Sequence, residues 1–361
     1  MRYSHNTGTF IGKGGTEIFF QSWCVESPRG ILVIAHGLGE HSGRYDNIIN
    51  ELKGKRISVY ALDHRGHGRS GGKRGHVESF MDYVDDLKLF IDIIQEENDA
   101  IPLILLGHSM GGVIACKYAL AHSEDVSGLI LSSPGLSTVI EIPGWKKTLV
   151  GFLSRYLPRV TLSSRLDPNM LSHDRDVVEA YENDRFVHSQ ISAKWATEFI
   201  NSGQECLNRA LELRMPLLAF HGKEDMIVDY RATENIYNNA SSLNKELYLF
   251  KELYHETMNE IDYKKVVQIV ARWIIKVISA KKTVKLAKKK AHKKPITKVW
   301  KKAIKKAVKK YHAKAPLSKG AKKITKKKGV KKIVGTTKKT GKKIVKKAAK
   351  KTAKKTTKKK K

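Results

Sequence analysis

The sequence predicts an α/β protein, with a mostly parallel sheet that has helices on both faces. Short apolar runs rich in β-branched residues recur along residues 31–250, and several of them end in Gly, His, Asp or Ser. Between them lie longer stretches whose apolar residues recur at helical spacing. Near-continuous apolar strands that alternate with helices are typical of a parallel sheet covered on both faces. Active sites in such sheets lie at the carboxyl ends of the strands, where the polar motifs of this sequence fall.

The strands and helices are expected to alternate along the chain. The apolar runs predict strands at residues 31–35, 57–62, 102–106, 128–131, 216–220 and 246–250. Apolar residues three and four positions apart predict helices at residues 45–52, 80–94, 112–121, 232–239 and 263–278.

One interval interrupts the alternation. Residues 135–214 contain no convincing strand and include two amphipathic pieces, at 145–157 and 191–213. We therefore predict an inserted helical cap at approximately 135–214. The apolar side chains of 145–157 either pack on the core or form a lid that exposes an apolar groove, and the pattern leaves both open.

The strong positive charge is confined to the C-terminal part of the chain. The net charge is +34, yet residues 1–280 contain 31 basic and 35 acidic residues. Residues 281–361 contain 38 Lys and no Arg, Asp or Glu. We predict a folded domain at 1–280 and a lysine-rich tail at 281–361, because so charged a segment buries too little apolar surface to fold alone.

The tail resembles the lysine-rich tails of linker-histone-like proteins. Apolar residues at i, i+3 and i+4 predict an amphipathic helix at approximately 296–312, and the remainder is expected to be disordered. The expected partner is an anionic membrane surface or nucleic acid, and composition alone does not separate them. A purely solubilising tail is the third alternative.

Cysteine usage and the N-terminus indicate a reducing compartment. Cys24, Cys116 and Cys206 are odd in number and lack metal-binding spacing, so we expect no disulfide framework, no metal and no cofactor. The first ten residues lack a signal-peptide core, and no apolar run reaches about 18 residues. We expect a cytoplasmic protein, with any membrane or nucleic-acid association through the tail.

The most informative motif is Gly107-His108-Ser109-Met110-Gly111. It follows a predicted strand and precedes a predicted helix, which is the context of a nucleophile elbow. The serine there sits on a sharp turn, so the positions two before and two after it must be small. We predict that Ser109 is a catalytic nucleophile.

A serine hydroxyl needs an imidazole to take its proton and a carboxylate to orient that imidazole. The acid precedes the histidine in this arrangement, and both follow the serine. Asp225 lies on the turn after the strand at 216–220, although Glu224 and Asp229 are also candidates. His255 lies shortly after the last predicted strand and is the expected base.

The anion that forms on the attacked carbonyl needs two backbone N–H donors. Met110, the residue after the serine, would supply the first. The strand at 31–35 runs into the glycine-rich segment 36–45, where Leu38 is the candidate for the second.

Five ordered motifs resemble the monoacylglycerol lipase and lysophospholipase family of serine α/β hydrolases. They are HGLGEHSGRY at 36–45, DHRGHGRSGG at 63–72, GHSMGG at 107–112, HGKEDMIVD at 221–229 and YHETMNE at 254–260. The match extends over most of residues 8–278 and includes cap segments similar to that family's DPN and YxxDP sequences, at 167–169 and 181–184.

The resemblance implies the α/β-hydrolase fold and a triad of Ser109, Asp225 and His255, with Leu38 and Met110 as the oxyanion hole. It further implies an apolar cap channel for one acyl chain. Four residues would lie around the polar head group or the pocket floor, namely Glu40, His41, Arg44 and Tyr181. The motif at 63–72 is a structural loop in that family, and we interpret it as scaffold.

The predicted function is therefore a serine carboxylic-ester hydrolase for single-chain lipids, monoacylglycerol or lysophospholipid, acting through an acyl-enzyme. Thioesterase, peptidase and acyltransferase activities use the same triad and remain alternatives. A protein that compacts nucleic acid through its tail is the non-enzymatic alternative. One departure from the family is Arg185, which stands in place of the usual proline and could favour an anionic lysophospholipid head group.

Overall fold

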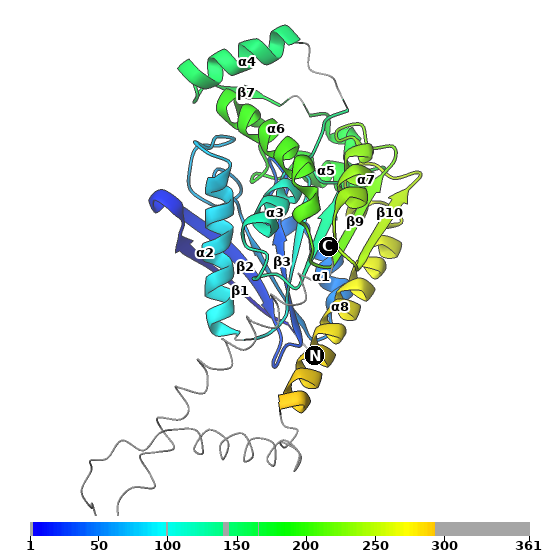
Figure 1. The fold of residues 1–361 in the computed structure, drawn as a ribbon. Coiled ribbons are helices and arrows are strands. Elements are labelled where there is room, and N and C mark those ends of the chain that lie inside the picture. The colour runs from blue at the N-terminus through cyan, green and yellow to red at the C-terminus, as the bar shows by residue number, and fades with distance from the viewer. Residues whose placement is uncertain (1–2, 99, 140–143, 165, 293–361) are drawn as a thin grey trace, which may run out of the picture. The chain divides into compact units, whose positions relative to one another are not determined.

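The computed structural model describes residues 3–98, 100–139, 144–164 and 166–292. Within these residues, eight strands form one sheet in the order β1-β2-β4-β3-β5-β6-β9-β10 (Figure 1). The strands are β1 (Ser4–Ile11), β2 (Glu17–Cys24), β3 (Gly30–Ala35), β4 (Ile57–Leu62), β5 (Leu103–His108), β6 (Gly128–Ser132), β9 (Leu217–Gly222) and β10 (Lys245–Phe250). From β4 to β10 all neighbours are parallel, whereas β1 and β2 are antiparallel. This arrangement confirms the predicted fold class.

Helices cover both faces of the sheet (Figure 1). Side chains alternate across each strand, so Ile31 and Val33 of β3 pack in one apolar cluster while Leu32 and Ile34 pack in another. The first cluster includes α2 (Met81–Glu97), α3 (Met110–Ala121) and α7 (Tyr230–Asn239). The second includes α1 (Asp46–Leu52) and α8 (Tyr263–His292). Because β3 and β5 are buried on both faces, they read as continuous apolar runs in the sequence.

At one edge of the main sheet, the described residues contain two strands that the sequence did not reveal, β1 and β2. β1 is largely exposed and polar, so it has neither an apolar run nor a clear alternation. It pairs with β2, which in turn pairs with β4 at the edge of the sheet. The predicted helix at 263–278 is also longer, since α8 continues to His292. Its added residues are mostly Lys and Ala, which have high intrinsic helix propensity.

The cap lies between β6 and β9. It comprises α4 (Gly144–Tyr156), β7 (Thr161–Ser163), α5 (Arg175–Glu182), β8 (Gln190–Ser192) and α6 (Ala193–Asn208). The expectation that this interval has no strand is wrong in detail, because β7 and β8 form a small antiparallel pair. Strands of three residues are too short to give a recognisable sequence pattern.

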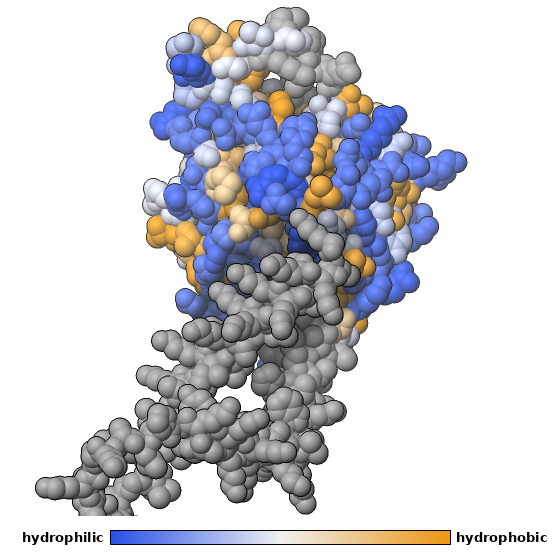
Figure 2. Space-filling view, in the orientation of Figure 1, coloured by the Kyte–Doolittle hydropathy of each residue, from blue (hydrophilic) through white to orange (hydrophobic). Residues whose placement is uncertain are grey.

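Three apolar side chains of α4 are largely exposed. Leu149 is 49% exposed, Phe152 56% and Tyr156 60%, so they do not pack on the core. Figure 2 shows apolar patches of this kind on an otherwise largely hydrophilic face. Within the described residues, no helix has both the length and the apolar composition needed to cross a bilayer. The predicted tail helix at 296–312 lies outside the described residues, as does the rest of 293–361.

Candidate active site

Ser109 lies on a sharp turn between β5 and α3. Its backbone angles are φ 53° and ψ −118°, a left-handed region that non-glycine residues rarely adopt. Three backbone hydrogen bonds hold it there. Ser109 N–H donates to the carbonyl of Ser132 at 3.0 Å, and the carbonyl of Ser109 accepts from Gly112 at 2.9 Å and Gly135 at 2.8 Å. The surrounding chain therefore imposes the strained geometry of a nucleophile elbow.

The glycines on either side of Ser109 are required by close backbone contacts. A Cβ added at Gly107 would lie 2.2 Å from the carbonyl oxygen of Gly111, and one added at Gly111 would lie 2.0 Å from that of Ala35. A Cβ at Gly37 would lie 3.2 Å from the Cβ of Ser109. The segment after β3 therefore passes directly beside the serine.

Asp225 and His255 are joined by a short hydrogen bond. His255 Nδ1 donates to Asp225 Oδ2 at 2.6 Å, which fixes the tautomer that leaves Nε2 as a proton acceptor. His221 Nε2 donates to the same oxygen at 2.9 Å. Asp225 Oδ1 accepts from the backbone N–H groups of Ile227 at 2.8 Å and Val228 at 2.9 Å. The carboxylate is thus fully hydrogen-bonded at the start of the loop after β9.

The ionisation of this pair follows from its surroundings. Burial raises the pKa of Asp225, but the charges and hydrogen bonds of His255 and His221 outweigh it and leave that pKa well below its ordinary value. Burial lowers the pKa of His255, yet the Asp225 carboxylate more than compensates and raises it above 6.5. The pair is suited to hold a proton on His255 while Asp225 stays ionised.

A cavity of about 370 Å³ opens over the serine. Ser109 and His255 both line it, as do Leu38 and Met110. The ring of His108 lies 4.9 Å from that of His255, between centroids. One side of the cavity is apolar and includes Leu166, Met170, Leu171, Ile191, Trp195, Phe199, Ile200, Met226, Ile227 and Val228. A cavity with one apolar side and a few polar groups at one end is typical of a small-molecule site.

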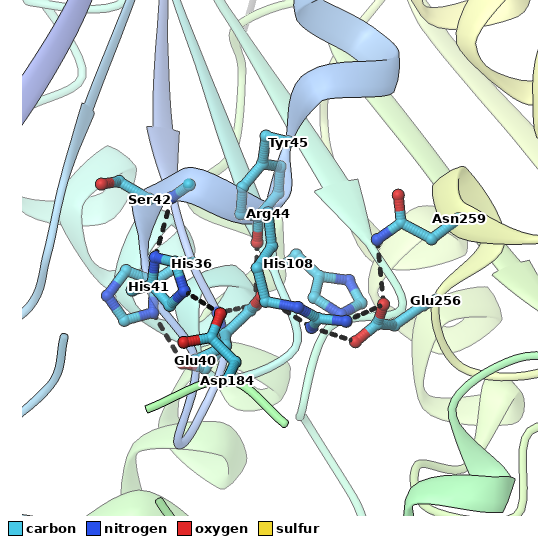
Figure 3. A network of polar contacts seen from close by, with 12 residues as sticks. His36, Glu40, His41, Ser42, Arg44, Tyr45, His108, Asp184, Glu256 and Asn259 are labelled. Atoms are coloured by element: carbon cyan, nitrogen blue, oxygen red, sulfur yellow. Dashed lines mark hydrogen bonds and ion pairs between the residues drawn. The ribbon is translucent and has the colours of Figure 1, made fainter. Parts of the chain in front are cut away.

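The polar end of the cavity contains a buried ion-pair network. Arg44 donates to Glu256 through Nη1 at 2.5 Å and Nη2 at 3.0 Å, and through Nη1 to Glu40 at 3.2 Å. Figure 3 shows Arg44 between the two carboxylates. Glu40 Oε1 also accepts from the backbone N–H of Gly37 at 2.5 Å and from the hydroxyl of Tyr45 at 2.9 Å. Glu40 therefore fixes the backbone of the segment beside Ser109.

Comparison with known proteins identifies the family of this chain. The family model described as "Serine aminopeptidase, S33" matches residues 26–262. The chain belongs to this family.

Individual relatives indicate which kind of hydrolase the chain is similar to. A monoacylglycerol lipase of Mycolicibacterium smegmatis is 35% identical over 269 residues, which cover 74% of this chain and 96% of that protein. Phospholipase YtpA of Bacillus subtilis is 30% identical over 241 residues, which cover 66% of this chain and 92% of its own. The crystal structure of the monoacylglycerol lipase of Paleococcus ferrophilus is 30% identical, with a TM-score of 0.65, and covers 77% of this chain and all of that one. The resemblance of the core motifs is thereby confirmed, and the chain is a serine hydrolase of the esterase type.

The structure places most of the predicted site residues of this S33 family member around the cavity. Glu40, Arg44 and Tyr181 line it together with the residues above. His41 does not line it; its Nε2 instead donates to Asp184 Oδ2 at 2.7 Å. Of the other carboxylates near Asp225, Asp229 caps α7 by accepting from Arg231 N–H at 2.9 Å.

Glu256 and His221 belong to the site but were not predicted from the sequence as site residues. Glu256 follows His255 directly, but its partner Arg44 is 212 positions away, so no local spacing reveals the pair. His221 lies in the same motif as Asp225 and could have been suspected from that position alone.

The cap is tied to the loop that carries His255. Glu260 is buried, and its Oε1 accepts from the backbone N–H of Tyr254 at 2.8 Å and from Nδ1 of His173 at 3.0 Å. On the other side of the cavity, His188 N–H donates to the carbonyl of Gly39 at 2.9 Å. The cap of this S33 family member is thus hydrogen-bonded to two loops beside the cavity, the loop with His255 and the segment after β3. In the described part of the chain, no three His, Cys, Asp or Glu side chains are grouped so that they could hold a metal ion.

The elbow packing predicts the effect of Gly111→Ala. The new methyl group would collide with the carbonyl of Ala35, so we expect a loss of about 1–3 kcal/mol in the free energy of unfolding, measured by urea denaturation. The matched control is Gly151→Ala in α4, where a Cβ meets nothing within 4 Å, and a gain of about 0.5–1 kcal/mol is expected. Equal stability of the two variants would contradict the packing described here.

The raised pKa of His255 predicts a pH profile. As the expected base, His255 must be neutral to act, so kcat/KM is expected to rise with pH through a midpoint above 6.5. Asp225→Asn should lower that midpoint and reduce kcat/KM by about 10⁴-fold, because the orienting charge is lost. Asp229→Asn, which keeps a good helix cap, is the control and should leave the profile unchanged. A profile insensitive to Asp225→Asn would show that another group sets the midpoint.

Proposed function

We propose that the protein hydrolyses lipid esters with a single acyl chain, monoacylglycerol or lysophospholipid, through an acyl-enzyme intermediate on Ser109. The observation that carries the proposal is the His255–Asp225 hydrogen bond at the edge of a cavity that also exposes Ser109. The apolar side of that cavity suits an acyl chain. The names of the lipase and phospholipase relatives support a lipid ester over other esters.

The mechanism assigns one role to each group. Ser109 Oγ attacks the ester carbonyl while Nε2 of His255 takes its proton, and the carbonyl oxygen becomes an anion. The backbone N–H groups of Leu38 and Met110 would bind that anion. His255 then gives the proton to the departing alcohol, which leaves the acyl group on Ser109.

The second half of the reaction uses the same groups. Water gives a proton to His255 and attacks the acyl-enzyme, and collapse of the second anion releases the carboxylic acid and restores Ser109. Asp225 stays ionised throughout and stabilises the imidazolium. Met110 is suited to the anion because it is the first residue of α3, where backbone N–H groups have no partner within the helix.

Other acyl transfers use the same triad, and they define the specificity controls. A thioester, a peptide or an acyl acceptor other than water would pass through the same acyl-enzyme. A dodecanoyl thioester and an aminoacyl anilide, measured beside the lipid ester, separate these reactions. A clear preference for the anilide would replace the lipid ester assignment with a peptidase activity.

Ser109→Ala tests the nucleophile. Release of p-nitrophenol from a medium-chain ester is expected to fall by about 10⁶-fold, since the triad acts as a unit. Ser132→Ala is the matched control, because its hydroxyl contacts His108 and not the reacting atoms, and it should lose far less. Retention of the wild-type rate in Ser109→Ala would remove Ser109 from the mechanism.

We further propose that residues 281–361 bind an anionic membrane surface. Each lysine near such a surface contributes about 1 kcal/mol, so a few of the 38 suffice for stable attachment. The exposed Leu149, Phe152 and Tyr156 of α4 favour a lipid surface over nucleic acid, because apolar side chains of this kind insert between lipid head groups. The lipid ester substrate favours the same surface.

Vesicle sedimentation tests the tail. The full chain is expected to sediment with phosphatidylserine-containing vesicles at low salt and to dissociate as salt rises, whereas a truncation after Ala280 should stay in solution. Neutral phosphatidylcholine vesicles are the control. Tail-dependent binding of duplex DNA without binding of anionic vesicles would overturn the membrane proposal in favour of nucleic acid.

A further inference from the structure

The charge at the polar end of the cavity carries an inference about the head group, which rests on the proposed function. In the proposed mechanism His255 protonates the departing alcohol, so the head group of the substrate must lie beside His255. Glu256 is the next residue, and it lines the cavity together with Glu40, Arg44 and Tyr181. These four side chains therefore surround the head group, while the acyl chain occupies the apolar side.

The fixed charge at this end is negative. Arg44 is the one Lys or Arg side chain among the described residues that line the cavity, and it faces two carboxylates. The side chain of Arg44 is 10% exposed and those of Glu40 and Glu256 are each 5% exposed, so water screens them weakly. Burial raises the pKa of Glu256, but Arg44 outweighs it and leaves that pKa below its ordinary value, so Glu256 is ionised.

A proton on His255 is balanced by the ionised Asp225 carboxylate. The other two histidines that line the cavity, His108 and His188, do not offset the negative charge of Glu40 and Glu256. Burial lowers the pKa of His188 and of His108 to about 4, so both are neutral at neutral pH. Asp167 adds a further carboxylate at the exposed rim. A phosphate that entered beside His255 would meet a net negative, poorly screened site.

The hydrogen-bonding groups of this site also favour an uncharged head group over a phosphate. Three of the five N–H groups of Arg44 already donate to carboxylates before a substrate arrives, two from Nη1 to Glu40 and Glu256 and one from Nη2 to Glu256. Its guanidinium also stacks on the ring of Tyr181, with 4.8 Å to the centroid. Carboxylates accept from hydroxyl groups, and burial raises the pKa of Tyr181 to about 12, so its hydroxyl remains a donor. A glycerol hydroxyl can donate to the carboxylates and accept from the hydroxyl of Tyr181. A phosphate oxygen can only accept.

Arg185 does not supply the missing positive charge. The expectation that it favours an anionic head group is not supported, because Arg185 is exposed and does not line the cavity. Its guanidinium stacks on Phe186 at 4.6 Å, and that of Arg69 stacks on the same ring at 4.8 Å. Both cations are held by this ring at the surface.

We propose that the cavity selects its substrate by charge: it accepts uncharged hydroxylated head groups and rejects phosphorylated ones, and Glu256 is the specificity-determining residue. Glu256 acts through its own charge and by neutralising Arg44. Glu40 shares the second role but also fixes Gly37, so its replacement would disturb the oxyanion segment as well.

The test uses two lipids that differ by one phosphate, 1-dodecanoylglycerol and 1-dodecanoylglycerol 3-phosphate, with full-length protein. The wild type is expected to prefer the neutral lipid in kcat/KM by about 100-fold or more. Glu256→Gln removes one charge at nearly constant shape and frees part of Arg44. It should reduce that preference about tenfold, mainly by lowering KM for the phosphorylated lipid.

Two controls separate charge selection from folding and catalysis. Hydrolysis of p-nitrophenyl dodecanoate, which has no glycerol head group, reports whether Glu256→Gln is folded and active. Glu182→Gln makes the same chemical change on the exposed surface of α5, outside the cavity, and should leave the preference unchanged. If Glu256→Gln does not fold, inhibition of the wild type by the two non-hydrolysable dodecyl ethers, with and without phosphate, still decides whether charge is selected.

The outcomes distinguish this inference from the proposed function. A wild type that cleaves p-nitrophenyl dodecanoate but neither lipid would refute the lipid substrate. A wild type that cleaves both lipids equally, or prefers the phosphorylated one, would overturn charge selection and leave the esterase intact. An unchanged preference in active Glu256→Gln would overturn the assignment to Glu256.

Discussion

The hydrogen bond from His255 to Asp225 is the interaction on which the rest of the site depends. At 2.6 Å it joins the loop after β10 to the loop after β9, and it orients the imidazole that we propose as the base for Ser109. His221 and two backbone N–H groups hold the carboxylate from its other sides. The side chain of His255, which lies on a loop, is thereby held in place by residues that directly follow strand β9. Without that constraint, the strained turn at Ser109 would present a hydroxyl with no base.

The remaining parts of the site are positioned by the same sheet edge. β3 leads into the segment that contains Leu38, and β5 leads into the elbow, so the two candidate oxyanion donors come from neighbouring parallel strands. Glu40 and Arg44 then connect the β3 segment to Glu256 in the His255 loop. Glu260 connects that loop to the cap. A buried ion-pair network of this kind contributes little net stability, and its value lies in fixing geometry and charge where the head group would bind.

The sequence predicted the parts of the molecule that local physics determines. Fully buried parallel strands read as apolar runs, and Gly107 is required by a backbone contact only four residues away, with Gly111. The Arg44–Glu256 pair could not be predicted, because it depends on two loops 212 positions apart meeting in the fold. The position of His41 away from the cavity depends in the same way on Asp184 of the cap. β1 was missed because an exposed edge strand needs no apolar pattern.

Covalent labelling by an alkyl fluorophosphonate, followed by mass spectrometry of the digested protein, tests the central claim most directly. The reagent reacts with a serine only when a neighbouring base activates it. We predict one adduct per chain, on the peptide that contains Ser109, and a labelling rate at least 100-fold lower in His255→Ala, in keeping with the usual contribution of a general base. An adduct on another residue, or an equal rate in His255→Ala, would contradict the account.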